Sequence, residues 1–419
     1  MKVFKFGGAS VKDAAGVRNV AKVLAHFPDD DLLIVVSAMG KTTNALEEEV
    51  SAYRDGGNTK PLLLALRGMH ATALQDVAPN DADASARLTA SFDDLMKYVS
   101  TPFDRAADHD YDHIVAFGEV WSTLIVSAHL NSAGITNTWT DARGIVRTDG
   151  LHRAARVDWA AAQQQADARL KPLLATRPAR IVTQGFIGAT ADGHTTTLGR
   201  EGSDFSAAIF AYLLDAESVT IWKDVPGMFN ADPKKFPDTR LLEHISYREA
   251  IELSYFGASV IHPRTLQPLQ QKHIPLYVRS FIDLDAPGST IDDRSENDSL
   301  IPSFIVKPKQ LLVSITPRDL GFIVEENLSG IFWLFAQRNV RIDLMQNSAL
   351  AFTVVVDDTP RAQELIAELR KGYEVRYNSA CELVTVRHYD EPTLAALTTG
   401  REVLLEQRSR TTARFVLRS

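Results

Sequence analysis

Short apolar segments alternate with longer helical patterns through most of this 419-residue chain. The apolar segments are rich in β-branched residues, as strands are, and they cover residues 2–6, 32–36, 180–186, 218–222 and 274–278. Parallel strands need a crossover between them, and that crossover is usually a helix. The sequence therefore predicts an α/β domain with a mainly parallel sheet.

One helix between these strands has recognisable ends. Ser246 and Glu249 form the S-x-x-E capping box ahead of the segment AIELSYFG. In this box the two side chains satisfy each other's backbone N–H groups, so the helix starts beside Ser246. Gly257 stands where the helix should stop, because glycine readily adopts the left-handed conformation that ends helices.

A polar and strongly charged segment, DDRSENDSLIPS at 292–303, interrupts the alternation. Such segments often separate domains, so we expect a first domain over residues 1–300 and a second region over 304–419. Beyond the boundary the pattern becomes strand, helix, strand, strand, helix, and a weaker echo of it follows. We expect a compact α+β module over about residues 308–372 and a shortened relative over about 373–419.

Charge and cysteine content limit the partners. The net charge is -8, from 45 Lys and Arg against 53 Asp and Glu, so nucleic acid is not an expected partner. The single cysteine, Cys381, cannot form an internal disulfide, which favours a reducing, cytoplasmic location and a place for this residue in the core. We see no apolar stretch of membrane-spanning length and no secretory signal, so no membrane partner is expected.

The chain opens with a strand that ends in Gly7 and Gly8 and carries Lys5. A tight turn between a strand and a helix exposes backbone N–H groups that can hold phosphate oxygens. The alternative is an ordinary turn beside a surface lysine, which glycine pairs mark more often. Neither the P-loop pattern nor the G-x-G-x-x-G fingerprint is present here.

A second Gly-rich loop, TTTLGREGSDFSAA at 195–208, leads into an apolar helix. Arg200 offers a planar fork for a carboxylate or phosphate, Ser203 offers a hydroxyl, and Asp204 offers either a helix cap or a partner for a lysine. The alternative is a capped helix with a solvated entry.

Two further segments carry charged residues. The segment KDVPGMFNADPKK at 223–235 runs from a strand into turn signals, and a plain hydrophilic loop is its alternative. FGEVWS at 117–122 places Glu119 at an expected strand-to-helix junction, where a glutamate commonly just favours the helix dipole. All four segments fall at expected strand ends, where open α/β sheets bind ligands.

Five segments, in order KFGGAS, FGEVWS, GREGSDFSAA, IWKDVPGMFNADP and FGASVIHPRTL, resemble the aspartate kinase family of the amino acid kinase superfamily. The likeness extends over essentially the whole chain. It implies an αβα catalytic domain followed by regulatory ACT domains. It also implies transfer of the γ-phosphoryl group of ATP, with Mg²⁺, to the side-chain carboxylate of L-aspartate, the first step towards lysine, threonine and methionine.

The residue types suit this reaction. A carboxylate with a pKa of about 3.9 is ionised at neutral pH, so the nucleophile needs no general base. The obstacle is repulsion between two anions, because each pair of unit charges about 4 Å apart costs roughly 4 kcal/mol at an effective dielectric of about 20. Cancelling one such repulsion is worth nearly a thousandfold in rate. Fixed cations are therefore the expected catalytic groups.

The resemblance also implies roles for single residues. Lys5 would reach the transferring phosphoryl group, with Asp204 orienting it, while Arg200 would bind the aspartate α-carboxylate and Glu119 its ammonium. The remaining substrate contacts would come from Ser37, Thr43 and Ser203. The ATP site would comprise Lys5, Gly7, Gly8, Ala9, Lys223, Asp224, Phe229, Lys234 and Ser259. No metal ligand is assigned.

Four positions depart from the usual family pattern. Ala9 and Lys223 stand where threonine is common, and Ser259 replaces a lysine that helps to hold the nucleotide in some members. Glu201 occupies a position often held by glycine. None of these departures removes Lys5, so we still expect activity.

The segment 321–352 resembles the effector-binding part of an ACT domain. Asp343 and Ser348 match positions that hold a feedback amino acid in relatives, but Ala349 replaces a glutamate of lysine-sensitive members. Lysine, threonine or no effector all stay open. The resemblance implies a homodimer through the ACT region, and we expect the apolar helix face with Ile331, Phe332 and Phe335 to be core.

Two rival functions remain at this stage. Other members of the superfamily phosphorylate glutamate, acetylglutamate, carbamate or nucleoside monophosphates. The departures at Ala9 and Ser259 also suit a kinase-like sensor that binds an amino acid without turnover.

Overall fold

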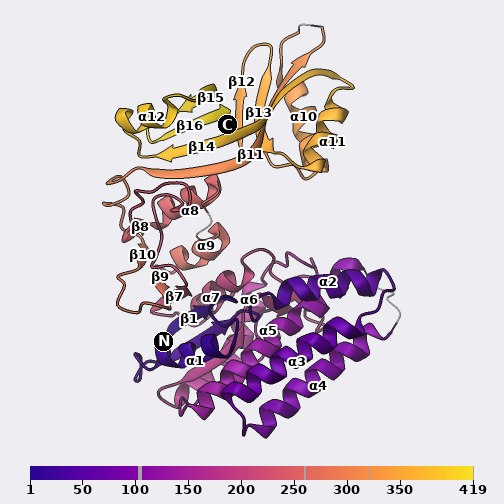
Figure 1. The fold of residues 1–419 in the computed structure, drawn as a ribbon, viewed down its shortest axis with the longest axis vertical. Helices are drawn as coiled ribbons and strands as arrows, with labels where there is room; N and C mark the ends of the chain where they lie inside the picture. Colours follow the sequence, from indigo (N-terminus) through magenta and orange to yellow (C-terminus); the bar gives the residue numbers. More distant parts are fainter. Residues whose placement is uncertain (102–105, 259–260, 320, 419) are drawn as a thin grey trace. The chain divides into compact units, whose positions relative to one another are not determined.

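The computed structural model describes residues 1–101, 106–258, 261–319 and 321–418, which form two compact units. The first unit consists of residues 1–228, 241–251 and 260–295, and the second of residues 229–240, 252–259 and 296–419. Figure 1 shows the elements of both units in sequence colours.

The first unit is built on an eight-stranded sheet in the order β3-β4-β2-β1-β7-β9-β10-β8. Neighbouring strands are parallel except β9 and β10, which are antiparallel. All five apolar segments that predicted strands contribute one. The strands are β1 (Lys2–Phe6), β2 (Leu32–Val36), β3 (Thr138–Thr140), β4 (Arg180–Gln184), β7 (Ser218–Lys223), β8 (His244–Ser246), β9 (Leu276–Ser280) and β10 (Ser289–Asp292). A separate hairpin pairs β5 (Ile187–Ala189) with β6 (Thr195–Thr197).

Helices cover both faces of this sheet. Phe4 and Phe6, on one face of β1, belong to a core that also contains Val17 of α1 and Trp121 of α5. Lys5 projects to the opposite face, because side chains alternate along a strand, and it meets Asp204 of α7 there. The first unit is therefore a three-layer αβα sandwich, as predicted. Its helices are α1 (Ala14–Leu24), α2 (Thr42–Arg54), α3 (Lys60–Val77), α4 (Ala82–Val99), α5 (Ala107–Ser132), η1 (Ala142–Gly144), α6 (Trp159–Arg169), η2 (Lys171–Ala175), α7 (Gly202–Leu213) and α9 (Pro263–Gln271).

The predicted cap of α8 (Tyr247–Phe256) is present. The Glu249 backbone N–H donates to Ser246 Oγ at 3.0 Å, and the helix ends before Gly257, which has a φ of +111°. A local sequence signal was sufficient here because both helix ends are set by neighbouring residues.

Helix α5 differs from the expectation that no apolar stretch reaches membrane-spanning length. By length and composition it is the one helix in the described ranges that could cross a membrane, yet 89% of its most apolar window is buried inside the protein. It is the central helix of the first unit and packs against α2, α3 and α4.

The second unit contains a six-stranded antiparallel sheet in the order β12-β13-β11-β14-β16-β15. Its elements are β11 (Ser303–Pro317), α10 (Glu325–Gln337), β12 (Leu344–Asn347), β13 (Phe352–Asp357), α11 (Pro360–Leu369), β14 (Tyr373–Arg387), α12 (Glu391–Thr398), β15 (Glu402–Arg408) and β16 (Thr412–Arg418).

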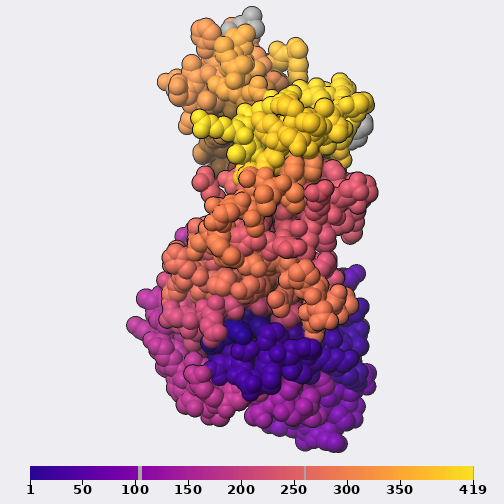
Figure 2. All heavy atoms as spheres, turned by 90° about the vertical axis from the view of Figure 1, so that its left-hand side faces the viewer, coloured from indigo at the N-terminus to yellow at the C-terminus, as the bar shows by residue number. Residues whose placement is uncertain are grey.

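Two long strands, β11 and β14, pair with each other along almost their whole length and contribute to both halves of this sheet. The later part of β11 and the early part of β14 join α10, β12, β13 and α11 in a β-α-β-β-α-β module. The early part of β11 and the later part of β14 join α12, β15 and β16 in a second, shorter module. The pairing register shifts between the two parts, where Lys309 and Ala380 have positive φ. In the space-filling view the yellow C-terminal segment lies against orange residues of the same unit (Figure 2).

Most of the expected core of this unit is buried. Ile331 and Phe335 of α10 are fully packed, and so is Cys381. The expectation was wrong for Phe332, which is 40% exposed and touches only the edge of the core through the ring of Phe352, 5.5 Å away between centroids. Phe332 follows Ile331 directly in the helix, so the two side chains point about 100° apart.

Candidate functional site

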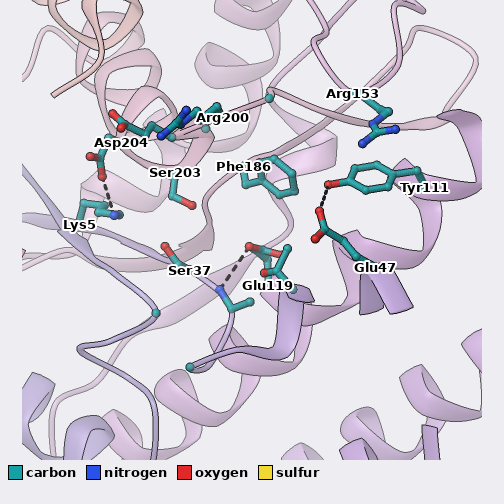
Figure 3. Close-up of a pocket in the computed structure, with 17 residues that line it drawn as sticks. Lys5, Ser37, Glu47, Tyr111, Glu119, Arg153, Phe186, Arg200, Ser203 and Asp204 are labelled. Atoms are coloured by element: carbon teal, nitrogen blue, oxygen red, sulfur yellow. Dashed lines mark hydrogen bonds and ion pairs between the residues drawn. The ribbon is translucent and has the colours of Figure 1, made fainter. Parts of the chain in front are cut away.

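A cavity of about 570 Å³ opens in the first unit (Figure 3). Its lining residues come from β1, from the segments that follow β1, β2, β4 and β6, from helices α2, α5 and α7, and from the loop at Arg153. The carboxyl ends of parallel strands meet at one edge of the sheet, so the polar residues that follow them come together. The predicted site residues on its wall are Lys5, Gly8, Ser37, Thr43, Glu119, Arg200, Ser203 and Asp204.

Lys5 and Asp204 form the most buried ion pair of the cavity wall. Lys5 Nζ lies 2.5 Å from Asp204 Oδ1, and their side chains are 11% and 6% exposed. Asp204 lies in the first turn of α7, whereas the N-cap position belongs to Glu201. Helix capping, the alternative role for Asp204, is therefore excluded, and its carboxylate instead fixes the lysine ammonium at the end of β1.

The turn after β1 leaves no room for a side chain at Gly8. A Cβ atom there would lie 2.7 Å from the Ala38 carbonyl oxygen, and the Gly40 N–H donates to the Gly8 carbonyl at 3.0 Å. Two strand-end loops thus touch through backbone atoms. The helix that follows begins only at Ala14, where the Asp13 carboxylate accepts the Gly16 N–H.

Glu119 lies in the middle of α5 and not at a strand-to-helix junction, so that expectation was wrong. The segment around it is buried on every side, so it lacks the one-sided apolar pattern by which amphipathic helices are recognised. Glu119 is 3% exposed. Its Oε1 accepts the Ala38 N–H at 3.3 Å, and within the described ranges its Oε2 has no hydrogen-bond partner.

Burial raises the pKa of Glu119 to about 8, although the N–H group of Ala38 opposes the shift. A carboxyl group in such surroundings is largely neutral at pH 7 until a cation arrives. Glu119 lines the cavity near Phe186 (Figure 3), and its Oε2 has no hydrogen-bond partner among the described residues, so an ammonium group is the ligand that this carboxyl group suits best.

Three residues of the cavity wall have a strained backbone. Arg153, Phe186 and Glu201 line it, and their φ angles are 66°, 69° and 55°. A non-glycine residue in this left-handed region costs about 1–2 kcal/mol, and such residues cluster at functional sites. Glu201 thus keeps the left-handed backbone that the glycine common at this position would adopt freely.

Three cavity residues had no signal in the sequence. Glu47, Tyr111 and Arg153 form the wall that lies away from Lys5 (Figure 3). The Tyr111 hydroxyl donates to Glu47 Oε1 at 2.7 Å, and the Arg153 guanidinium lies 4.1 Å from the centroid of the Tyr111 ring. Single exposed charges on a helix or loop are common, so only the fold reveals that they meet.

Four further residues of the expected ATP site belong to the first unit but are not on this cavity wall. Gly7 and Ala9 belong to the same turn as Gly8, and Lys223 and Asp224 mark the end of β7. Phe229 and Lys234 belong to the second unit. Ser259 lies outside the described residues.

The expected effector residues lie in the second unit. Asp343 has a side chain only 5% exposed and forms an ion pair with Lys307, which also lies 3.1 Å from Asp357 Oδ1. Ser348 Oγ donates to the Ala351 carbonyl at 3.2 Å. The carboxylate that would meet an effector's ammonium is thus already engaged by a lysine of the chain.

Taken together, the cavity wall carries three cations, which are Lys5 at the strand end, Arg200 just before α7 and Arg153 on the opposite side (Figure 3). It also carries a buried carboxyl group, Glu119, whose Oε2 has no hydrogen-bond partner in the part of the chain that the structure describes. A ligand with negative groups at its ends and a positive group between them complements this arrangement. The cations would also offset the repulsion between an acceptor carboxylate and a phosphoryl group.

The sequence of residues 1–280 matches the amino acid kinase family. Over 399 residues the chain is 31% identical to the lysine-sensitive aspartokinase 3 of Escherichia coli. The alignment covers 92% of this chain and 86% of that protein. It is 35% identical over 303 residues to a bifunctional aspartokinase/homoserine dehydrogenase of Arabidopsis thaliana. That alignment covers 71% of this chain and 33% of the length of the longer protein.

Solved structures of an aspartokinase are also similar to this chain. The chain superposes on Escherichia coli aspartokinase III in complex with aspartate and ADP with a TM-score of 0.82 at 27% identity, covering 100% of this chain and 96% of that one. A complex of the same enzyme with lysine and aspartate also gives a TM-score of 0.82, at 27% identity over 99% of this chain and 95% of that one.

Proposed function

The chain belongs to the amino acid kinase family, and as a relative of its aspartokinases we propose that it phosphorylates the side-chain carboxylate of L-aspartate with ATP. The product would be 4-phospho-L-aspartate, the first intermediate on the way to lysine, threonine and methionine. The observation that carries the proposal is the buried pair of Lys5 and Asp204 beside a carboxyl group, Glu119, with a free oxygen.

In this mechanism the acceptor carboxylate attacks the γ-phosphorus as an anion and transfers no proton. A bond forms between the carboxylate oxygen and the γ-phosphorus while the bond from that phosphorus to the β,γ-bridging oxygen breaks, and ADP leaves with the electron pair. Lys5 stabilises the negative charge that gathers on the phosphoryl oxygens, and Asp204 keeps its ammonium in place. Glu119 ionises when it binds the substrate ammonium. Arg200 binds the α-carboxylate, and Ser37, Thr43 and Ser203 supply hydrogen bonds.

The nucleotide would approach the turn of Gly7, Gly8 and Ala9, where Gly8 allows close backbone contact. Lys223, Asp224, Phe229, Lys234 and Ser259 are the further ATP contacts that we propose from the family resemblance.

Mg²⁺ would enter with the nucleotide, since this ion is held mostly by phosphate oxygens and water, with one or two carboxylates. Within the described ranges, no three His, Cys, Asp or Glu side chains form a group that could hold a metal ion. The ion's chemical contribution would be to neutralise phosphate charge.

A specific feature of the cavity favours an amino acid acceptor over a nucleoside monophosphate or carbamate. Glu119 is buried and has one oxygen without a partner among the described residues, and neither of those acceptors brings an ammonium group to satisfy it. Glutamate and an amino acid sensor without turnover are the two rivals that the geometry leaves open.

One assay separates these functions. Hydroxylamine converts an acyl phosphate into a coloured hydroxamate, and a coupled reaction measures ATP consumption in parallel. Hydroxamate formed with L-aspartate but not with L-glutamate supports the proposal. Tight aspartate binding without ATP consumption would contradict it in favour of a sensor.

The C-terminal region 304–419 would regulate the kinase domain, residues 1–300, through an amino acid effector, with lysine and threonine as the candidates. We propose Asp343 and Ser348 as effector contacts from the family resemblance. A homodimer through this region is proposed as well, because Phe322, Trp333 and Met345 are 71%, 61% and 54% exposed and all belong to the first module of the second unit. We expect the enzyme to act in the cytoplasm.

A further inference from the structure

A cavity of about 540 Å³ opens in the second unit, and basic side chains line it. Its wall is formed by the ends of β14, β15 and β16, by the turn between β15 and β16, and by the last part of α8, which belongs to the same unit. The described residues on this wall include three arginines, Arg387, Arg408 and Arg414, and a single carboxylate, Glu252. Neither the proposed kinase reaction nor the proposed effector contacts use this cavity.

The strand register brings the basic side chains to one face of the sheet. Arg387 of β14 lies opposite Thr412 of β16. Arg414, two residues further along β16, lies opposite Thr385 on one side and Gln407 on the other. Cross-strand partners, and residues two apart in a strand, share a face of the sheet. The other face carries apolar residues that pack with α12, so the two faces of this end of the sheet have different chemistry.

Arg414 is a partly buried cation without a carboxylate partner. Its Nη2 donates to the Asp343 carbonyl at 2.7 Å, and its Nε donates to Thr385 Oγ1 at 3.3 Å. Within the described ranges Arg414 forms no ion pair, and its Nη1 has no hydrogen-bond partner. Burial lowers the pKa of Arg414, although the charge of Asp343 opposes the shift. Such a cation is costly when only neutral acceptors meet it, and an anion in the cavity would offset that cost.

Phe256, at the end of α8, contacts two of the guanidinium groups. Its ring centroid lies 5.0 Å from Arg414 Cζ and 6.0 Å from Arg387 Cζ. Arg387 is 8% exposed, and its Nη1 donates to Thr412 Oγ1 at 2.8 Å. Contacts with one aromatic ring restrict the orientations of both cations. The donor groups are therefore held in place before any ligand arrives, which lowers the entropic cost of binding.

The carboxylates near the cavity do not neutralise all three arginines equally. Arg408 donates to both carboxylate oxygens of Glu391, at 2.9 and 3.1 Å, and also pairs with Glu406. Glu252 Oε2 lies 3.5 Å from Arg387 Nη1, and its side chain is 38% exposed. Glu252 is thus a weak competitor for Arg387, and the charge of Arg414 is available to a ligand.

We propose that this cavity binds a small multivalent oxyanion, with Arg414 and Arg387 as its charge partners and the Thr411 hydroxyl as a further donor. Guanidinium forks match phosphate and carboxylate oxygens in geometry, and two of them suit an anion with more than one negative charge. Cavities of this volume hold small organic ligands. The ligand would be a metabolite that carries phosphate groups or several carboxylates. The proposal does not depend on the proposed kinase function.

Calorimetry with inorganic pyrophosphate and with citrate distinguishes the two sources of the anion. At least one of these probes should bind the wild-type protein. R414M keeps an apolar stem but removes the charge, and it should weaken binding about tenfold or more, because hydrogen bonds to charged groups correspond to such a factor. R414K keeps the charge without the fork and should show a smaller loss. E252Q removes the competing carboxylate and should strengthen binding about two- to fivefold.

Two control variants make the result specific. K5A reports on binding of a probe to the cavity of the first unit, and it should leave the affinity of the arginine-lined cavity unchanged. R376A removes an arginine of β14 whose side chain is 84% exposed, and it should leave the affinity unchanged as well. Heat unfolding without a probe checks the fold of R414M, which should unfold at about the same temperature as the wild type.

Each result supports or overturns the proposal. Pyrophosphate binding that R414M weakens identifies a phosphate-bearing ligand, and the same result with citrate identifies a polycarboxylate. Binding of neither probe, or equal affinities of the wild type and R414M, would overturn the site. Loss of binding in K5A but not in R414M would place the probe in the first unit only and would overturn it too. Should R414M unfold earlier than the wild type, E252Q decides, because unchanged or weaker binding in that variant would contradict the proposal.

Discussion

Lys5 Nζ lies 2.5 Å from Asp204 Oδ1 and thereby joins the end of β1 to the first turn of α7. Replacing Lys5 with alanine should lower kcat at least about a thousandfold, because one fixed charge no longer offsets the repulsion between acceptor and phosphate. Steady-state rates with saturating aspartate and ATP measure this loss. K22A, which removes an exposed lysine of α1, should keep full activity.

The same variant leaves Asp204 buried without its cation. Breaking a buried pair costs about 3–5 kcal/mol, so the free energy of unfolding of K5A should fall by an amount in that range. K5R keeps the charge and should recover most of the stability but little of the activity. Full activity in K5A would refute the assigned role of the lysine.

The raised pKa of Glu119, about 8, predicts a pH-dependent affinity. Between pH 6 and 8 the carboxyl group of the empty cavity is mostly protonated, and binding of an ammonium requires the ionised form. The KM for aspartate should therefore fall as the pH rises, by up to about tenfold per unit below pH 8. Calorimetry in buffers of different ionisation enthalpy should detect proton release on binding.

Stability should change in the opposite direction with pH. The pKa of Glu119 is raised in the folded protein above its usual value of 4.5, so its contribution to stability is fully present below about pH 4.5 and is lost as the pH rises through about 8. E119Q should be more stable than the wild type at pH 8 while binding aspartate weakly at every pH. Identical pH profiles for the wild type and E119Q would contradict this account.

Gly8 is the position where a single methyl group should matter most. In G8A the added Cβ would meet the Ala38 carbonyl at 2.7 Å, which forces the two strand-end loops apart. We expect the KM for ATP to rise about tenfold or more with a smaller change for aspartate. G68A is the matched control, because an added Cβ in α3 meets nothing within 4 Å and should stabilise the helix by about 0.5–1 kcal/mol.

Lysine should be a weak effector of this enzyme. Asp343 is paired with Lys307, and Ala349 provides no second carboxylate for the side-chain ammonium of a bound lysine. Initial rates with lysine, threonine and both should show a larger effect of threonine, which has no such ammonium. Strong inhibition by lysine alone would show that the Lys307 pair opens on binding.

The proposed homodimer can be tested by replacing exposed apolar side chains of the first module in the second unit. The double variant F322S/W333S should shift the protein from dimer to monomer, measured by light scattering at micromolar concentration. I282S removes an equally exposed residue of the first unit and should leave the dimer intact. A wild-type monomer would contradict the proposed homodimer.

The sequence was sufficient for the parts of the fold that depend on local patterns. Buried parallel strands such as residues 32–36 are continuous apolar runs, and the α8 cap is set by residues three apart. It was insufficient for Glu119, since α5 is buried all round and has no periodic apolar face. The pairing of Arg153 with Tyr111 joins residues 42 apart in the chain, a contact that no local pattern encodes.

The second unit could be predicted in its elements but not in their connections. The segments 373–378 and 381–390 look like two separate strands in the sequence, and in the structure Ala380, between them, has a positive φ. The structure joins them in one strand, β14, of 15 residues.

Strands β11 and β14 also decide how this unit can be divided. A chain cut after residue 372 would leave the first module without its fourth strand, and it would strip the early part of β11 of its neighbour. The two modules thus share strands β11 and β14. Neither module can be gained, lost or exchanged by adding or removing residues at the C-terminus alone, because each contains part of both strands. Any perturbation that separates β11 from β14 therefore disrupts both modules at the same time.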